Sequence, residues 1–180
     1  MATAQPTLDA REALVAEPSA GVSAPATALG IVRILLGFVF LWSFLDKTFG
    51  LYATAPGESW LAGDSPTSGY LGSVDGTFGG VFNAMAGQAW VDWSFMLGMG
   101  LVGTALVLGV GLRLAAVGAV ALMGTLYLTS LPLENNPVID EHLIYAVLAV
   151  ALASVRAGDA LGAGRWWSSL AVVRNNRWLA

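Results

Sequence analysis

The chain has 180 residues, of which 56% are hydrophobic and only 11% charged, and its mean hydropathy is +0.69. Soluble domains carry about 25% charged residues, so this composition indicates an integral membrane protein with no separate catalytic domain. The formal net charge is −4, and no basic patch with interleaved aromatic residues is present, which argues against nucleic-acid binding. The sequence has no cysteine and one histidine, which excludes dithiol chemistry, iron–sulfur clusters and bis-histidine haem ligation within one chain.

Four hydrophobic stretches, in chain order, predict an all-α polytopic membrane protein built as a four-helix transmembrane bundle. The predicted spans lie within a bundle domain over residues 27–157 and cover about 28–49, 94–110, 114–131 and 138–155. Residues 1–26 are rich in Ala, Pro, Ser, Thr and Glu without an apolar period, which predicts a disordered cytoplasmic tail. Residues 50–88 form a long polar, glycine-rich loop, and residues 158–180 an amphipathic cytoplasmic tail lying on the membrane.

The positions of the basic residues predict the orientation of the spans. With both termini cytoplasmic, the cytoplasmic side holds six arginines, namely Arg11, Arg113, Arg156, Arg165, Arg174 and Arg177. The opposite side has Lys47 as its one cation and is otherwise acidic. By the positive-inside rule, we predict a multi-pass protein of a plasma (inner) membrane with an N-in, C-in topology, so that the long loop is extracytoplasmic.

Two clusters of ionisable residues sit at the ends of predicted spans. Asp46-Lys47 ends the first span, and Asp140-Glu141-His142 opens the last. Counting about 20 residues back from the end of the last span places its cluster inside the bilayer, where each charge costs roughly 2.5–3.5 kcal/mol. Antiparallel topology brings both clusters to the same outer layer, so we predict an ion pair between Lys47 and Asp140 or Glu141.

Neighbouring residues extend this predicted polar site. Ser43 lies one turn before Lys47 on the same face, and Tyr145 lies one turn after Glu141. Aromatic walls could come from four tryptophans, namely Trp42, Trp60, Trp90 and Trp93. The alternative is that these groups sit at the membrane interface, reach water and pin the helix ends. We assign a structural role to Asp46.

Arg33 is a separate case because it lies about one turn inside the cytoplasmic end of the first span. There it could extend to water or meet Asp159. We predict a structural or topological role for it.

The same residues carry a resemblance to a known family. Segment 33–47 (RILLGFVFLWSFLDK) resembles the first helix of DoxX/DoxD membrane proteins, in which an arginine and a glycine precede a lysine at the helix end. Segment 59–71 (SWLAGDSPTSGYL) and the segment 90–93 (WVDW) resemble the DoxD-like branch. Segments 132–137 (PLENNP) and 140–146 (DEHLIYA) resemble the last-helix motif, so the resemblance covers about residues 28–170.

This resemblance implies a four-helix membrane subunit that takes part in sulfur or thiol redox chemistry at the quinone pool. In the DoxD branch, the small subunit belongs to a thiosulfate:quinone oxidoreductase and works with a second subunit. The implied partners are the lipid bilayer, a second redox or sulfur-handling protein and, as a possibility that the sequence leaves open, further copies of this chain.

Two functions from different classes follow. The first is the membrane subunit of a quinone-dependent oxidoreductase with a polar site in the outer half of the bundle. Its catalytic residues would be Lys47 as carbonyl donor, His142 as donor or proton relay and Asp140 as the group that orients them. Quinone contacts would come from Trp42, Ser43, Trp60, Glu141 and Tyr145. The predicted cofactor is thus a quinone, with no metal, haem or flavin.

The second function is a non-catalytic scaffold or accessory subunit, in which the charges lock the first span to the last and the Trp/Arg-rich tail docks soluble or respiratory partners. A small transporter is a third option. Charges confined to one layer of a four-span protein do not form a polar path through the membrane, although an oligomer could change that.

Overall fold

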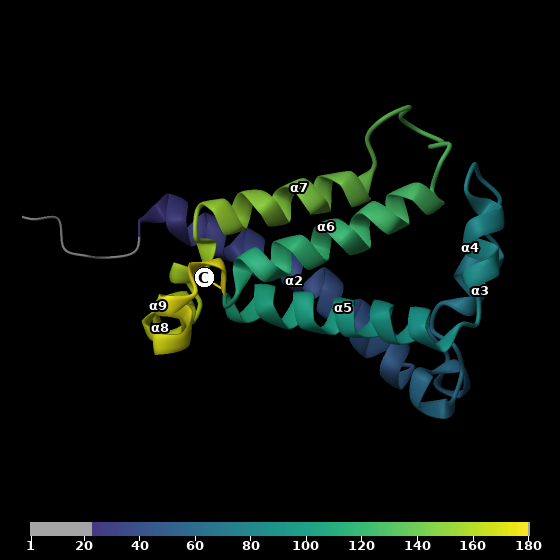
Figure 1. The fold of residues 1–180 in the computed structure, drawn as a ribbon, viewed down its shortest axis with the longest axis horizontal. Helices are drawn as coiled ribbons and strands as arrows, with labels where there is room; N and C mark the ends of the chain where they lie inside the picture. Colours follow the sequence, from purple (N-terminus) through teal and green to yellow (C-terminus); the bar gives the residue numbers. More distant parts are fainter. Residues whose placement is uncertain (1–22, 180) are drawn as a thin grey trace, which may run out of the picture.

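The computed structural model describes residues 23–179, and its architecture is all-helical in this part of the chain. The four longest helices are α2 (Ala24–Phe49), α5 (Ala89–Leu108), α6 (Leu112–Thr129) and α7 (Glu141–Ser154), as Figure 1 shows. The helices α2, α5 and α6 are long and apolar enough to cross a membrane. Helix α7 has 14 residues, about 21 Å at 1.5 Å per residue, which is shorter than the roughly 30 Å hydrocarbon core.

Three predicted boundaries need correction. Residues 24–26, predicted as tail, are the first turn of α2, and residues 1–22 of that predicted tail lie outside the described part of the chain. The predicted span 138–155 is also too long, because residues 138–140 are non-helical and Asp140 is the N-cap of α7. Residues 89–93, predicted as loop, open helix α5.

Local chain chemistry explains where the long helices begin and end. The hydroxyl of Ser23 caps α2 by accepting from the Ala26 N–H at 3.4 Å, a role that suits serine at an N-cap. Between α5 and α6 the backbone turns through two left-handed residues, Gly109 with φ 75° and Gly111 with φ 58°. Glycine adopts this conformation without a Cβ clash, so the chain forms a tight antiparallel hairpin.

Helix α2 packs closely against α5, and α6 packs against α7, while α5 and α6 join the two pairs. Two glycines permit the close approach of α2 to α5: a Cβ on Gly103 would lie 2.5 Å from the Leu41 nitrogen, and one on Gly37 would lie 2.7 Å from the Val107 nitrogen. The buried core between the helices includes Phe40, Leu106, Ala119, Ala149 and Leu152.

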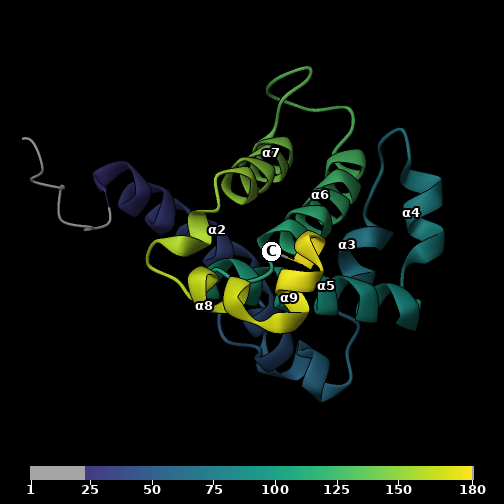
Figure 2. The ribbon, with the colours of Figure 1, turned by 60° about the vertical axis from the view of Figure 1, so that its left-hand side comes forward.

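The segment between α2 and α5 is not a plain loop as predicted. It contains the 3₁₀ turns η1 (Pro56–Glu58) and η2 (Trp60–Ala62) and the short helices α3 (Ser68–Gly72) and α4 (Gly79–Met85). A second apolar cluster of Leu71, Val74, Phe82 and Val91 joins α3 and α4 to the start of α5. This cap stands at one end of the bundle, beside the end of α6 (Figure 2). The Thr77 N–H donates to the Leu131 carbonyl at 3.1 Å and ties the two together.

The C-terminal segment folds against the opposite end, next to the α5–α6 hairpin (Figure 1). It comprises η3 (Ala157–Asp159), α8 (Gly164–Ser169), α9 (Ala171–Asn175) and η4 (Arg177–Leu179), in place of the predicted single amphipathic helix. Arg113 donates to the Arg177 carbonyl at 2.7 Å and fastens the segment to the start of α6.

The two ends of the bundle differ in charge. Exposed arginines gather at the end that carries the α5–α6 turn and the C-terminal segment: Arg113, Arg156, Arg165, Arg174 and Arg177. The end that carries α3 and α4 holds exposed acidic residues: Glu58, Asp64, Asp75, Glu134 and Glu141. Between the ends, large apolar side chains such as Leu35, Val117 and Val147 are more than 60% exposed, which suits contact with lipid.

Candidate functional site

A cavity of about 760 Å³ opens at the acidic end of the bundle. Helices α5 and α6 form its walls, and the α3–α4 cap contributes Thr67, Tyr70, Leu71, Phe82 and Met85. Lys47 reaches the cavity from the end of α2, and Glu141 and His142 reach it from the start of α7. The structure therefore brings three of the predicted polar residues to one space, although they come from opposite ends of the sequence.

The cavity is elongated and changes character along its length. On α6 its lining runs from Gly118 to Thr129, which is about 16 Å at the rise of an α-helix. Hydroxyl groups and charged groups gather at the Thr129 end, beside the cap. The lining near Gly118 is apolar, with Gly98, Ala121 and Leu122 as its neighbours. The cavity is therefore polar at the end beside the cap and apolar at the other end.

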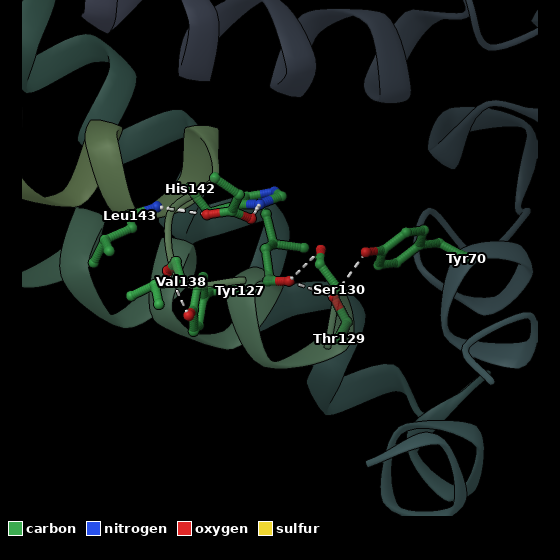
Figure 3. A network of polar contacts seen from close by, with 9 residues as sticks. Tyr70, Tyr127, Thr129, Ser130, Val138, His142 and Leu143 are labelled. Atoms are coloured by element: carbon green, nitrogen blue, oxygen red, sulfur yellow. Dashed lines mark hydrogen bonds and ion pairs between the residues drawn. The ribbon is translucent and has the colours of Figure 1, made fainter. Parts of the chain in front are cut away.

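Asp140 and His142 form a pair at the polar end. Nδ1 of His142 lies 2.7 Å from one carboxylate oxygen of Asp140, and the other oxygen accepts from the Leu143 N–H at 3.0 Å (Figure 3). Their side chains are 18% and 11% exposed. The carboxylate thus caps α7 and fixes the imidazole at once. It leaves Nε2 of His142 as the ring nitrogen that is not engaged by Asp140.

Asp140 lies outside the three membrane-length helices, and its surroundings favour the charged carboxylate. Burial by itself acts to raise the pKa of Asp140. The hydrogen bonds from the His142 ring and from the Leu143 N–H outweigh burial, so the pKa of Asp140 lies below its ordinary value of 3.8. A carboxylate that stays ionised keeps its grip on the imidazole at neutral pH.

The predicted ion pair of Lys47 does not form. Within residues 23–179 the ion pairs shorter than 4.0 Å are His142–Asp140 and Arg156–Asp159. Asp140 therefore turns to its neighbour on the same helix end, and the half-buried Lys47 is left to face the cavity. An ammonium group without a carboxylate at contact distance can donate to a ligand oxygen.

A chain of hydroxyl groups lines the same end of the cavity. The hydroxyl of Tyr70 lies 2.7 Å from that of Thr129, which also donates to the Leu126 carbonyl at 2.6 Å (Figure 3). Ser130 donates to the same carbonyl at 3.0 Å. These contacts join α3 of the cap to the last turn of α6, and they place a phenol at the cavity wall.

Asp92 organises the cap side of the cavity. It is buried, with 7% exposure, and its Oδ1 accepts from the hydroxyls of Ser65 at 2.8 Å and Thr67 at 2.6 Å. Thr67 in turn lines the cavity. The sequence interpretation gave none of Tyr70, Thr129 or Asp92 a role in the site. The available signal was a set of polar residues on the loop and in an apolar helix, which does not show that they meet.

Other predicted residues take structural positions. Asp46 is buried, and its carboxylate accepts three backbone N–H groups after the end of α2, from Tyr52 at 2.6 Å, Thr54 at 3.0 Å and Ala53 at 3.1 Å. Arg33 is fully buried rather than extended to water. It donates to the carbonyls of Leu161 at 2.8 Å and Ala160 at 3.4 Å, while Asp159 pairs with Arg156 at 3.3 Å.

Four residues predicted to contact a quinone lie away from the cavity lining. Trp42 stacks on Phe38, and Trp60 packs edge-on against Trp93 at 4.6 Å between ring centroids. The Ser43 hydroxyl donates to the Val39 carbonyl at 3.1 Å in its own helix, and Tyr145 packs against the core. The aromatic residues of α5 that do line the cavity are Trp90 and Phe95.

Comparisons with known proteins identify no relative of this chain. No protein-family model matches it, and neither the curated proteins nor the solved structures contain a match. Over residues 23–179 the chain is all-helical, and three of the helices described there could cross a membrane, by length and composition.

Proposed function

We propose that the cavity binds a quinone and that the protein is the membrane subunit of a quinone-linked oxidoreductase. The observation that carries this proposal is the composition of the polar end of the cavity. A free ammonium group, an imidazole held by a carboxylate and a phenol meet there beside apolar walls.

The cavity suits the shape and polarity of such a ligand. Small-molecule sites are typically 300–1,000 Å³, mostly apolar, with a few placed polar groups, and this cavity of about 760 Å³ lies in that range. A quinone ring has two carbonyl oxygens that need donors and two apolar faces. Lys47 and the imidazolium form of His142 can donate to the oxygens, and Phe95 and Leu122 belong to the apolar wall.

Each polar residue then has a definable task. A bound quinone supplies the two-electron acceptor, and the electrons would come from a thiol or a reduced sulfur compound that is oxidised on a partner subunit. Lys47 binds a carbonyl oxygen and stabilises negative charge as it develops there. His142 holds a proton at Nε2 in reach of the cavity, and Asp140 keeps its ring oriented and stabilises the imidazolium form. Glu141, exposed at the cavity rim, links His142 to water.

The same proposal includes a topology. Helix α7 would serve as a fourth, short span that begins after Asp140 and is lengthened at its other end by the exposed apolar residue Val155. The arginine-rich end would face the cytoplasm of a bacterial-type cell by the positive-inside rule. The polar end of the cavity would then open toward the outer side of the membrane.

Quinone binding can be measured on the purified protein without knowledge of the electron donor. A water-soluble short-chain quinone quenches indole fluorescence, and Trp90 lines the cavity, so a Trp90→Phe variant identifies its share of the signal. A hydrogen bond to a charged donor is worth about 1.5–3 kcal/mol. Lys47→Met should therefore raise the Kd about tenfold or more, and His142→Ala should raise it less.

Arg165→Met is the matched control, because Arg165 is exposed at the opposite end of the bundle. Its Kd should equal that of the unmodified protein. A folded protein that binds no quinone would overturn the proposal, as would equal effects of Lys47→Met and Arg165→Met.

A further inference from the structure

The apolar half of the cavity has no task in the chemistry just described, although it accounts for much of its length. From Thr129 the lining continues along α6 through Thr125 and Ala121 to Gly118, and Gly98 faces it from α5. Gly98, Gly118 and Ala121 leave room there beside the larger apolar side chain of Leu122. The cavity therefore continues between two membrane-length helices instead of ending at the polar groups.

This extension is open toward the sides of the bundle. Trp90 and Ser94 on α5, and Ala121 and Thr125 on α6, are lining residues that are also exposed. In a membrane, the flanks of these helices meet lipid rather than water. A ligand with an apolar chain can therefore leave its chain in this channel and continue into the bilayer.

We infer that the site selects an amphipathic ligand with one apolar chain, with its ring at Lys47 and His142 and its chain along Ala121 between α5 and α6. This inference rests on the proposed function and adds the direction in which the ligand lies. Its physical basis is the match between a cavity that is polar at one end and apolar at the other and a ligand with the same asymmetry. Each methylene that moves from water into the channel should tighten binding about fourfold.

The decisive comparison uses two quinones with the same ring, one with a decyl chain and one with a methyl group in its place. Both are titrated against the full-length protein in the same detergent, and the ratio of their Kd values gives the chain preference. Ala121→Phe places a ring in the channel at an exposed position. We expect it to lower the chain preference at least tenfold while the methyl analogue binds as before.

Val117→Phe is the control, since Val117 is 69% exposed on α6 and does not line the cavity. It should keep the full chain preference, which also corrects for partition of the decyl analogue into detergent. If Ala121→Phe keeps the preference as well, the chain lies elsewhere and the inference fails while quinone binding stands. If neither quinone binds the unmodified protein, the proposed function fails and the inference with it.

A second measurement fixes the direction without a variant that fills the channel. A decyl quinone with a photoreactive diazirine at the chain end is irradiated on the unmodified protein, and the labelled peptides are sequenced. Labels on α5 and α6 around Gly98 and Gly118 would support the inference. Labels confined to the cap, around Tyr70 and Phe82, would place the chain at the wrong end and overturn it.

Discussion

The Asp140 carboxylate allows fold and function to be tested separately, because it has two partners. One oxygen caps α7 through the Leu143 N–H at 3.0 Å, and the other holds Nδ1 of His142 at 2.7 Å. Serine is as good an N-cap as aspartate, but its single short hydroxyl cannot serve both partners. Asp140→Ser should therefore preserve the helix and release the imidazole, whereas Asp140→Ala should lose both contacts.

The expected sizes follow from these contacts. Loss of an N-cap costs about 0.5–2 kcal/mol, and an ion pair near a surface adds up to about 1 kcal/mol. Asp140→Ala should thus lower the free energy of unfolding by roughly 1–3 kcal/mol. Asp140→Ser should lower it by no more than about 1 kcal/mol. Both variants should impair proton-coupled quinone reduction equally, since His142 is unsupported in each.

Unfolding by sodium dodecyl sulfate in mixed micelles, monitored by tryptophan fluorescence, measures the difference in the free energy of unfolding. Quinone-linked turnover with the native donor measures the effect on quinone reduction. The pH dependence supplies a further check. Because the pKa of Asp140 is lowered in the folded protein, its contribution to the free energy of unfolding is fully present above about pH 3.8, the ordinary pKa of the group. This contribution is lost as the pH falls through the lower pKa of the folded protein. Asp140→Ser should lack this acid-side loss. If Asp140→Ser is as unstable as Asp140→Ala, or if its turnover is normal, the dual role is refuted.

Two further predictions concern the frame around the site. Asp46→Ala removes the acceptor of three backbone N–H groups, so amide hydrogen exchange at residues 52–54 should accelerate and the free energy of unfolding should fall by about 2–4 kcal/mol. Asp75→Asn, an exposed acidic control on the same side, should change neither quantity. Unaltered exchange in Asp46→Ala would show that the contact is absent. Gly103→Ala would set a Cβ 2.5 Å from the Leu41 nitrogen and should cost about 1–3 kcal/mol by forcing α2 from α5. Gly124→Ala, with open space around it, should be neutral or slightly stabilising in the same unfolding assay, and similar losses for both glycines would contradict the close packing.

Much of the helical frame was predictable because membrane helices are encoded by local hydropathy. Long apolar runs identified α2, α5 and α6 to within a few residues. The fourth predicted span was less well placed. The apolar residues Val138 and Ile139 extend the hydrophobic run, but the N-cap Asp140 makes the helix begin only at Glu141. Hydropathy does not detect such caps.

The convergence of Lys47 with His142 could also be predicted, because antiparallel topology alone sets which helix ends share a layer. The partner that Asp140 takes could not be predicted in this way. Sequence favoured an ion pair between Lys47 and Asp140, whereas the N-cap geometry of α7 directs Asp140 to His142, two residues away. A short-range contact imposed by the backbone prevails over a longer one that needs two side chains to meet.

Sequence by itself determined the long helices that are apolar enough to cross a membrane and the separation of most arginines from most acidic residues along the chain, since composition and hydropathy act residue by residue. Tertiary structure decided which further polar groups join Lys47 and His142 at the cavity and which partners the buried charges take. The fold buries Arg33 and Asp46 against backbone groups, and it brings Tyr70 of the cap to Thr129 of α6. Such encounters depend on how helices cross and how a connecting segment folds back, and these are settled by packing among residues far apart in the chain.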